Sequence, residues 1–341
     1  TTFTRLVPSD RPEGVVIPTR VIEQPGIVAY ALSETRFGQP RSDLYIRLRT
    51  PLASQDADSK VMADLLADYL NDRLSAMTYD AAIAGASLGV QSTQSGFTLQ
   101  ASGYHDGVMR LVPNVLETLP PPLIDAGTFA RLKARQLDRL SAYDKQRPVN
   151  RLLSELTVTL MPREFLEADR LAAIVALDRE TFHEYQKAVF TGLVAEAFLH
   201  APLTLAESTG SLKRLIAKLP IDPDGAGIEL STGLWPEGAQ TEFRYNHPDH
   251  ASVLAFVIDD DSASARLKAQ LLANLIEAPF YTQLRTEKQL GYLTFAMAFP
   301  VLNRPILAGA VQSPNVEATV LAAEIKGFFR GFRETLAQLD P

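Results

Sequence analysis

Arg285 and Tyr292 are the two residues of this chain whose types and spacing could do chemistry together. Tyr292 follows Arg285 by seven positions, which in a helix is a rise of about 10 Å. A guanidinium and a phenol held about that far apart on rigid backbone could both hold one extended peptide. The same spacing also arises where an arginine makes a salt bridge and a tyrosine ring simply packs, so spacing alone leaves both interpretations open.

The elements that must position this pair are predicted from the residues around it. Phe280 and Leu284 are four apart on one helical face, and good helix formers follow them. Gly291 stands where a helix C-cap glycine is expected. From residue 293 to 299, large and small side chains alternate with the period of a strand. The arginine is therefore expected in the last two turns of a helix, and Tyr292 at the turn into a strand.

The complete string around the pair resembles a known family. Residues 284–292 fit the pattern LRT-x-x-QLGY of the pitrilysin and insulin-degrading enzyme family, which are inverzincin-type zinc metallopeptidases. Residues 79–85 (YDAAIAG) and 194–200 (VAEAFLH) resemble a helix end and the final strand of that family's third domain. The resemblance extends from about Ala29 onward.

That resemblance implies a function. The family has four homologous domains, and an Arg and a Tyr of the last domain contact the substrate beside a zinc ion bound by the first. By resemblance, Tyr292 is the catalytic donor to the oxyanion or carbonyl, and Arg285 and Tyr292 bind the substrate. Gly291 would be the turn that lets Tyr292 face the chamber. Thr286 and Gln289 are expected to be structural.

The zinc motif of the family, H-x-x-E-H on a helix, is not in this sequence. None of the five histidines forms it, and Pro248 between His247 and His250 would break a helix. A polar loop is the better interpretation of that pair. Without cysteine, thiolate zinc sites and thiol catalysis are excluded. We therefore expect no metal in this chain. Zinc is expected in a missing N-terminal half, the zinc-binding half.

Two functions follow as hypotheses. The first is the C-terminal, substrate-chamber half of a zinc-dependent endopeptidase that degrades or processes short polypeptides. Its partners would be a peptide substrate and the N-terminal half of the same polypeptide, and this chain alone would be inactive. The alternative is a non-catalytic, peptidase-like partner or peptide-binding subunit. An upstream H-x-x-E-H in the gene would favour the first, as does retention of both Arg285 and Tyr292. Processing of a cofactor precursor and general peptide turnover both stay open.

Composition restricts the class of protein. The chain has 341 residues, of which 46% are hydrophobic and 21% charged, as in an ordinary globular protein of two domains. A net charge of −7 and the lack of Lys/Arg runs with interleaved aromatics disfavour nucleic acid. No apolar run approaches a membrane span. The start, Thr1–Arg5, has no signal-type apolar region and no initiator Met, which favours a processed or cut end. We expect a periplasmic protein, with the cytoplasm as the alternative.

An internal repeat predicts the domain organisation. The order strand, polar loop, helix and glycine in residues 44–89 returns about 206 residues later, in residues 253–291. The turn-rich run 220–227 is the best boundary. We therefore predict an α+β fold of two homologous domains, 1–222 and 223–341, resembling the family's third and fourth domains. Each would be a mainly antiparallel sheet with helices packed on one face, and the second would be incomplete at its C-terminal end.

Overall fold

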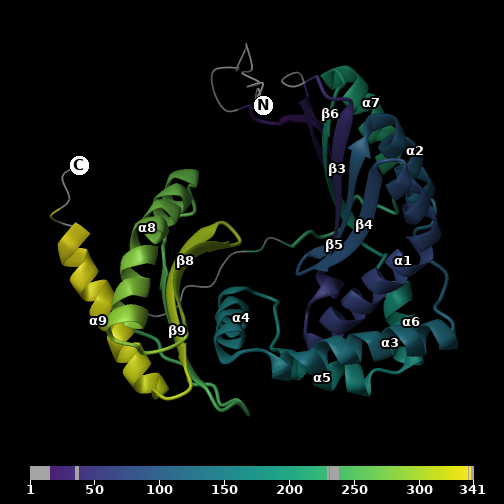
Figure 1. The fold of residues 1–341 in the computed structure, drawn as a ribbon. Coiled ribbons are helices and arrows are strands. Elements are labelled where there is room, and N and C mark those ends of the chain that lie inside the picture. Colours follow the sequence, from purple (N-terminus) through teal and green to yellow (C-terminus); the bar gives the residue numbers. More distant parts are fainter. Residues whose placement is uncertain (1–15, 35–37, 229, 231–237, 337, 339–341) are drawn as a thin grey trace. The chain divides into compact units, whose positions relative to one another are not determined.

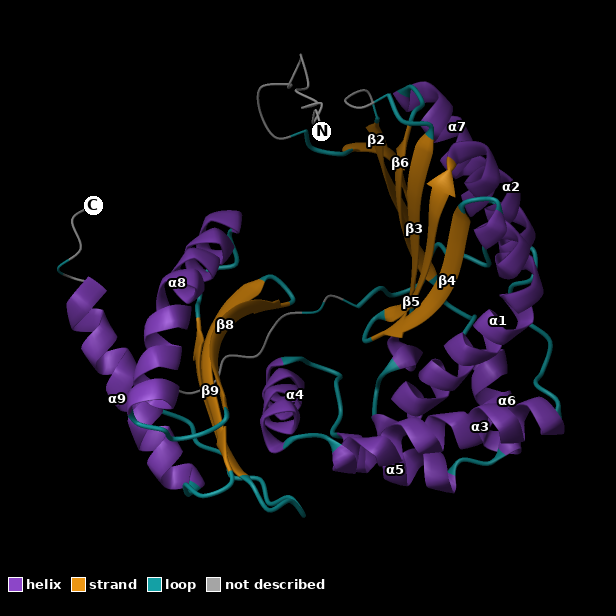
Figure 2. Ribbon diagram, in the orientation of Figure 1, coloured by secondary structure: helices purple, strands orange, loops and turns teal. Residues whose placement is uncertain are grey.

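The computed structural model describes residues 16–34, 38–228, 230, 238–336 and 338. The chain divides into two compact units, which are residues 1–137 with 172–229 (unit 1) and residues 138–171 with 230–341 (unit 2). Figures 1 and 2 show a sheet with helices in each unit. The expectation about Thr1–Arg5 lies outside the described residues. Within the described part, no helix is both long and apolar enough to cross a membrane.

Unit 1 is built on a six-stranded mixed sheet of order β1-β2-β6-β3-β5-β4. All neighbouring strands are antiparallel except β2 and β6, which are parallel. The strands are β1 (Thr19–Gln24), β2 (Ile27–Ser33), β3 (Arg41–Arg49), β4 (Ala86–Thr93), β5 (Gly96–Tyr104) and β6 (Val194–Ala201).

Helices cover one face of this sheet, as the sequence predicts (Figure 2). The covering helices are α1 (Ala57–Ile83), α2 (His105–Leu116) and α7 (Leu205–Ile216). The remaining helices of this part of the chain are η1 (Pro51–Ala53), α3 (Ala126–Ser141), η2 (Ala142–Lys145), α5 (Glu167–Ala176) and α6 (Arg179–Ala188). α3 and α5 each begin in one unit and end in the other, and η2 belongs to unit 2.

The residue pattern explains β3 and α1, which are the first two elements of the segment β3-α1-β4-β5. On β3, Leu44, Ile46 and Leu48 are buried while the residues between them face the other side. α1 begins with a capping box, in which the Asp56 carboxylate accepts from the Ser59 N–H and the Ser59 hydroxyl oxygen accepts from the Asp56 N–H. The helix is therefore fixed at its first turn, directly after the strand.

Unit 2 contains a three-stranded antiparallel sheet of order β7-β9-β8. Its strands are β7 (His250–Val257), β8 (Leu293–Val301) and β9 (Arg304–Ser313). Besides η2 and the parts of α3 and α5 already given, its helices are α4 (Pro148–Leu160), α8 (Ala263–Tyr281), a π-helical turn η3 (Thr282–Glu287) and α9 (Ala318–Leu336). β3 and β7 hold corresponding places, because each pairs antiparallel with the second strand of the hairpin that follows it.

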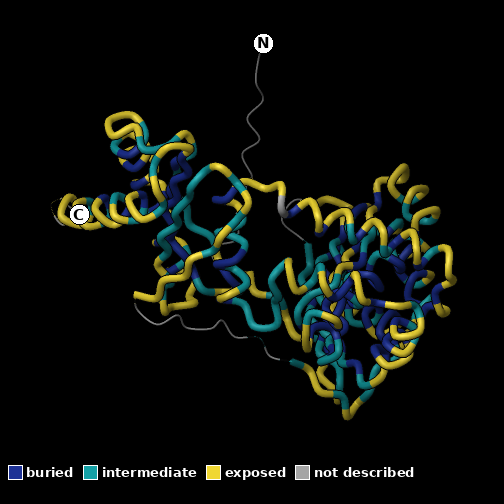
Figure 3. Tube along the Cα trace, turned by 90° about the horizontal axis from the view of Figure 1, so that it is seen from below, coloured by how far each residue is buried: buried dark blue, intermediate teal, exposed yellow. Residues whose placement is uncertain are grey.

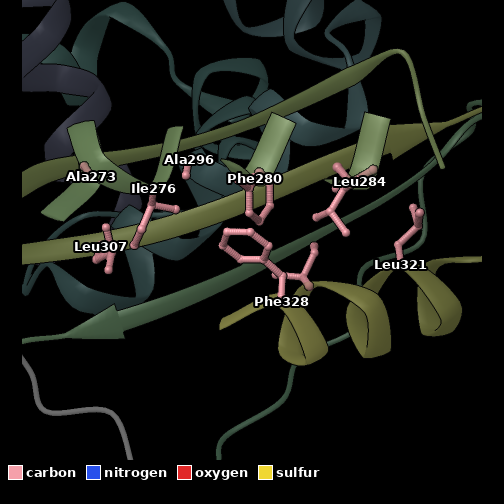
Figure 4. Packing of buried hydrophobic residues seen from close by; sticks show 10 residues of the cluster. Ala273, Ile276, Phe280, Leu284, Ala296, Leu307, Leu321 and Phe328 are labelled. Carbon is pink, nitrogen blue, oxygen red and sulfur yellow. The ribbon is translucent and has the colours of Figure 1, made fainter. Parts of the chain in front are cut away.

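The core of unit 2 lies between the sheet and the helices α8 and α9 (Figure 4). Phe280 and Phe328 are fully or almost fully buried and meet edge to face at 4.9 Å between ring centroids. Gly309 on β9 makes room for the rings of Phe329 and Phe280, since a Cβ there would lie 2.7 Å from the first and 2.9 Å from the second. Buried residues, dark blue in Figure 3, alternate with exposed ones along these helices.

α4 packs on the opposite face of the same sheet. Leu156 and Leu160 contact Val301 and Ile306, and the apolar side chains of β7 that share this face join them. The expectation of helices on one face only is therefore wrong for the sheet of unit 2. The reason is that β7 and β9 carry apolar side chains on both faces of the sheet, so both faces require cover.

Candidate functional site

The connection from α8 to β8 differs from the predicted helix end. The α-helical hydrogen bonds stop at Tyr281, and one π-helical turn follows at residues 282–287. Gln289 then adopts a left-handed backbone with φ of 53°, and the Leu290 N–H donates to the Leu284 carbonyl oxygen at 2.9 Å. The left-handed residue of this helix end is thus a glutamine, and the predicted role of Gly291 as the C-cap glycine is wrong.

Gly291 is needed for a different reason. A Cβ at this position would lie 2.2 Å from the backbone carbonyl oxygen of Gln312 on β9. No side chain fits at that distance, so only glycine lets the chain approach β9 closely enough for β8 to begin. Gly291 therefore brings Tyr292 next to the end of β9.

The Arg285 side chain folds back onto this connection. Its Nη1 donates to the Gly291 carbonyl oxygen at 3.3 Å and also to the Tyr292 carbonyl oxygen. Its guanidinium carbon lies 5.6 Å from the centroid of the Tyr281 ring. The helical turns end before Tyr292, so the two residues are not spaced along one helix, and the guanidinium contacts the backbone of Tyr292. Nε and Nη2 of Arg285 carry three further N–H groups.

The Tyr292 side chain is 45% exposed, and its hydroxyl belongs to a triangle of polar groups. The hydroxyl donates to Asp249 Oδ2 at 2.7 Å. Gln312 Nε2 donates both to the same carboxylate oxygen and to the Tyr292 hydroxyl oxygen, at 2.7 Å each. The one proton of the phenol is thus on its bond to Asp249, and the phenol oxygen accepts from Gln312.

Electrostatics favour one protonation state of this triangle. The hydrogen bonds from Gln312 and Tyr292 hold the pKa of the Asp249 carboxyl below its ordinary value. The bond to Asp249 raises the pKa of the Tyr292 phenol, with desolvation adding to the shift. A charged carboxylate and a neutral phenol are therefore both stabilised.

α4 supports the triangle at two points. The Val149 N–H in its first turn donates to Gln312 Oε1 at 3.2 Å. Two residues later, the Arg151 guanidinium carbon lies 3.7 Å from the centroid of the Tyr245 ring. Tyr245 precedes Asp249 by four residues, so this contact ties the segment that carries the carboxylate to α4.

The ionisable groups beside this contact are largely buried. The Arg151 guanidinium carbon also lies 4.9 Å from the centroid of the Tyr143 ring, and the Tyr143 hydroxyl donates to Glu155 Oε1 at 3.4 Å. Desolvation raises the pKa of Glu155 and of Tyr245. These groups tie α4 to the segments that carry Tyr143 and Tyr245.

The residues described do not fit a zinc ion. Among them, no group of three or more His, Cys, Asp or Glu side chains could hold a metal. His247 Nδ1 accepts from the Asp249 N–H at 3.0 Å, and His250 faces Glu317 at 3.6 Å. The two imidazoles thus serve local contacts in the polar loop before and at the start of β7.

The sequence indicated Arg285 and Tyr292, which the structure brings together, but Asp249 and Gln312 were not identified. Gln312 had one usable signal, as a long polar side chain directly after the apolar strand residues 306–311. Asp249 had none, because its position between two histidines is typical of a polar loop. Their proximity depends on the pairing of β7, β8 and β9, which are distant in sequence.

Comparison with known proteins agrees with this architecture. Residues 2–173 match the family described as the middle or third domain of peptidase M16. Residues 271–341 match the C-terminal lobe domain 4 of proteins similar to the PQQ synthase PqqF. The crystal structure of pitrilysin superposes with a TM-score of 0.83 at 20% identity, covering 98% of this chain and 35% of that one.

Curated relatives extend well beyond the matched region. Protease 3 of Escherichia coli is 24% identical over 332 residues, covering 95% of this chain and 34% of its own length. The A-factor-processing enzyme of Saccharomyces cerevisiae is 22% identical over 314 residues, covering 90% of this chain and 30% of its own. A structure described as a peptidase M16 inactive domain from Pseudomonas fluorescens has a TM-score of 0.67 at 16% identity, covering 96% of this chain and 81% of that one.

The chain spans about a third of the length of the curated relatives it matches. Its fold is that of pitrilysin, and the match to the M16 middle domain covers half of its residues. The chain therefore belongs to the M16 peptidase family, of which it represents the middle and C-terminal region.

Proposed function

We propose that this chain supplies the substrate-binding part of a zinc-dependent endopeptidase that degrades or processes short polypeptides. The observation that carries the proposal is the Tyr292 hydroxyl, which is exposed yet held by a buried amide and a charged carboxylate. A tyrosine that only packed would bury its ring, as Tyr143 does, whereas the Tyr292 ring is exposed. Gln312 on β9 and Asp249 directly before β7 hold the hydroxyl at the surface.

The chemistry assigned to Tyr292 is donation of its proton to the carbonyl oxygen of a bound peptide. To do so, the hydroxyl exchanges Asp249 for the substrate oxygen while it keeps the bond that it accepts from Gln312. Negative charge develops on a carbonyl oxygen as it is attacked, so a fixed donor stabilises the transition state more than the ground state. Arg285, through its Nε and Nη2 groups, is proposed to hold the peptide backbone beside this point.

Zinc would come from the zinc-binding half of the same polypeptide, because the described residues contain no ligand set for it. The order β-α-β-β, repeated with corresponding sheet positions, supports two homologous domains, for which we propose the spans 1–222 and 223–341. α4 would then be a segment of the first domain that packs on the sheet of the second. A periplasmic location stays a prediction.

A non-catalytic partner or peptide-binding subunit is the second candidate. It is favoured by the observation that Arg285 and Tyr292 already make bonds within the chain. The similar fold of a protein described as an inactive M16 domain is compatible with it. Both candidates bind peptide, so only cleavage separates them.

The test is reconstitution of activity. The chain alone should contain no stoichiometric zinc and cleave no peptide, whereas the chain joined to the zinc-binding half encoded with it should cleave fluorogenic peptides. Stoichiometric zinc in the isolated chain, lost on mutation of His247 or His250, would overturn the metal assignment. Peptide binding without cleavage by the joined protein, with zinc present, would favour the non-catalytic candidate.

A further inference from the structure

Gln312 is the buried member of the triangle. It is 0% exposed, whereas the side chains of Tyr292 and Asp249 reach the surface. Each of its two polar atoms is used within unit 2, since Oε1 accepts from Val149 and Nε2 donates to both partners. A buried amide left with an unpaired atom is costly, so this arrangement resists rotation of the side chain.

The orientation of the amide is imposed by α4. The Val149 N–H lies in the first turn of the helix, where backbone N–H groups have no acceptor within the helix. Because a backbone N–H can only donate, Gln312 Oε1 faces the helix and Nε2 must face the Asp249–Tyr292 pair. α4 is fixed independently by the packing of Leu156 and Leu160 on the sheet.

This orientation of the amide matters when the Tyr292 hydroxyl exchanges its acceptor Asp249 for a peptide oxygen. A hydroxyl that accepts one hydrogen bond is polarised and becomes a better donor in the next. When a peptide oxygen replaces Asp249, the bond from Gln312 to the phenol oxygen would be the one that remains. We propose that Gln312, oriented by the N-terminus of α4, is a positioning residue that holds the Tyr292 hydroxyl for donation to a peptide oxygen. The inference rests on the proposed function of Tyr292.

The first measurement needs no catalysis. The titration of Tyr292 is followed by ¹³C NMR of tyrosine Cζ in the chain, and its resonance is identified by its loss in Tyr292→Phe. Gln312→Leu removes the donor, and Gln312→Glu keeps an acceptor for Val149 while replacing the donor with an acceptor. Both should raise the pKa of Tyr292 above that of the wild type, and Gln270→Leu, which removes an exposed amide, should not. An unchanged Tyr292 titration in both Gln312 variants overturns the proposal.

The second measurement separates positioning from general support of the fold. In the protein joined to its zinc-binding half, Gln312→Leu should lower kcat about 10-fold with little change in KM, the scale of one hydrogen bond in a charged network. In the Tyr292→Phe background it should cause no further loss. An equal loss in both backgrounds would assign Gln312 a structural role only.

Separate control experiments test the folding of each variant and the proposed function. Circular dichroism checks each variant, and Gln312→Glu replaces Gln312→Leu in the cycle if the leucine variant does not fold. If Tyr292→Phe itself cleaves at the wild-type rate, the proposed function fails. The NMR titrations still decide whether Gln312 positions the hydroxyl.

Discussion

Each unit has a helix that leads into the first strand of a hairpin, α1 into β4 and α8 into β8, and the two connections differ. In unit 1, α1 stays α-helical to Ile83, and Gly85 turns the chain with φ of 77° directly into β4. In unit 2, α-helical hydrogen bonding stops at Tyr281, and a π-helical turn and five further residues precede β8. One connection is compact, and the other displays polar side chains.

The residue facing each connection differs in the same way. Gly103 pairs with the first residue of β4, and Gln312 pairs with the first residue of β8. In both units the backbones approach closely at this point. In unit 1 both approaching positions, Gly85 and Gly103, are glycine and present no side chain. In unit 2 only Gly291 is glycine, so the facing position can supply the amide that organises the site.

The largest expected effect comes from the glycines. Gly291→Ala would place Cβ 2.2 Å from a backbone oxygen, which cannot move aside, and should destabilise unit 2 by about 3 kcal/mol or more. Gly85→Ala meets the Tyr104 ring at 3.0 Å and a left-handed backbone, at a cost of about 1–2 kcal/mol. Urea denaturation of both variants checks the order. Equal costs would show that the two glycines serve one purpose.

Arg285 should matter more than its counterpart in unit 1. Arg285→Ala removes two hydrogen bonds to the connection and should lower the free energy of unfolding by about 1–2 kcal/mol. In the joined protein it should also raise KM and lower kcat, because a guanidinium on the substrate backbone binds the ground state too. Tyr79→Ala, at the corresponding exposed position of α1, should change stability by less than about 0.5 kcal/mol. Wild-type KM for Arg285→Ala would remove its substrate role.

The pH dependence tests the Tyr292–Asp249 bond. Asp249 has a lowered pKa, so its contribution to stability is present above its ordinary value of 3.8 and is lost as pH falls through the lowered value. Tyr292 has a raised pKa, so its contribution is present below its ordinary value of 10.0 and is lost as pH rises through the raised value. Asp249→Asn should flatten both limbs of a stability-against-pH curve. Retention of both limbs in that variant would place their origin elsewhere.

Many of the helices and strands could be predicted from the sequence, because the residue patterns that indicate them are local. The alternation on β3 and the packing face of Phe280 and Leu284 both depend on neighbouring residues. The resemblance also singled out Arg285 and Tyr292, which lie together in the structure.

The rest depended on contacts that no local pattern encodes. The π-helical turn moves the left-handed position from Gly291 to Gln289. α4 reaches the second sheet from a segment more than a hundred residues upstream, so nothing near Gln312 indicated its partner. Asp249 joins the site only through the strand pairing of unit 2.

The most direct test of the central claim compares one hydroxyl in each unit. In the protein joined to its zinc-binding half, Tyr292→Phe should lower kcat by about 10²-fold or more, the usual cost of losing one oxyanion donor. Zinc content should stay unchanged, and Tyr79→Phe, on the exposed end of α1, should cleave at the wild-type rate. A wild-type kcat for Tyr292→Phe, with the protein folded and zinc bound, would contradict the claim and leave Tyr292 as a surface ring at the end of a connection.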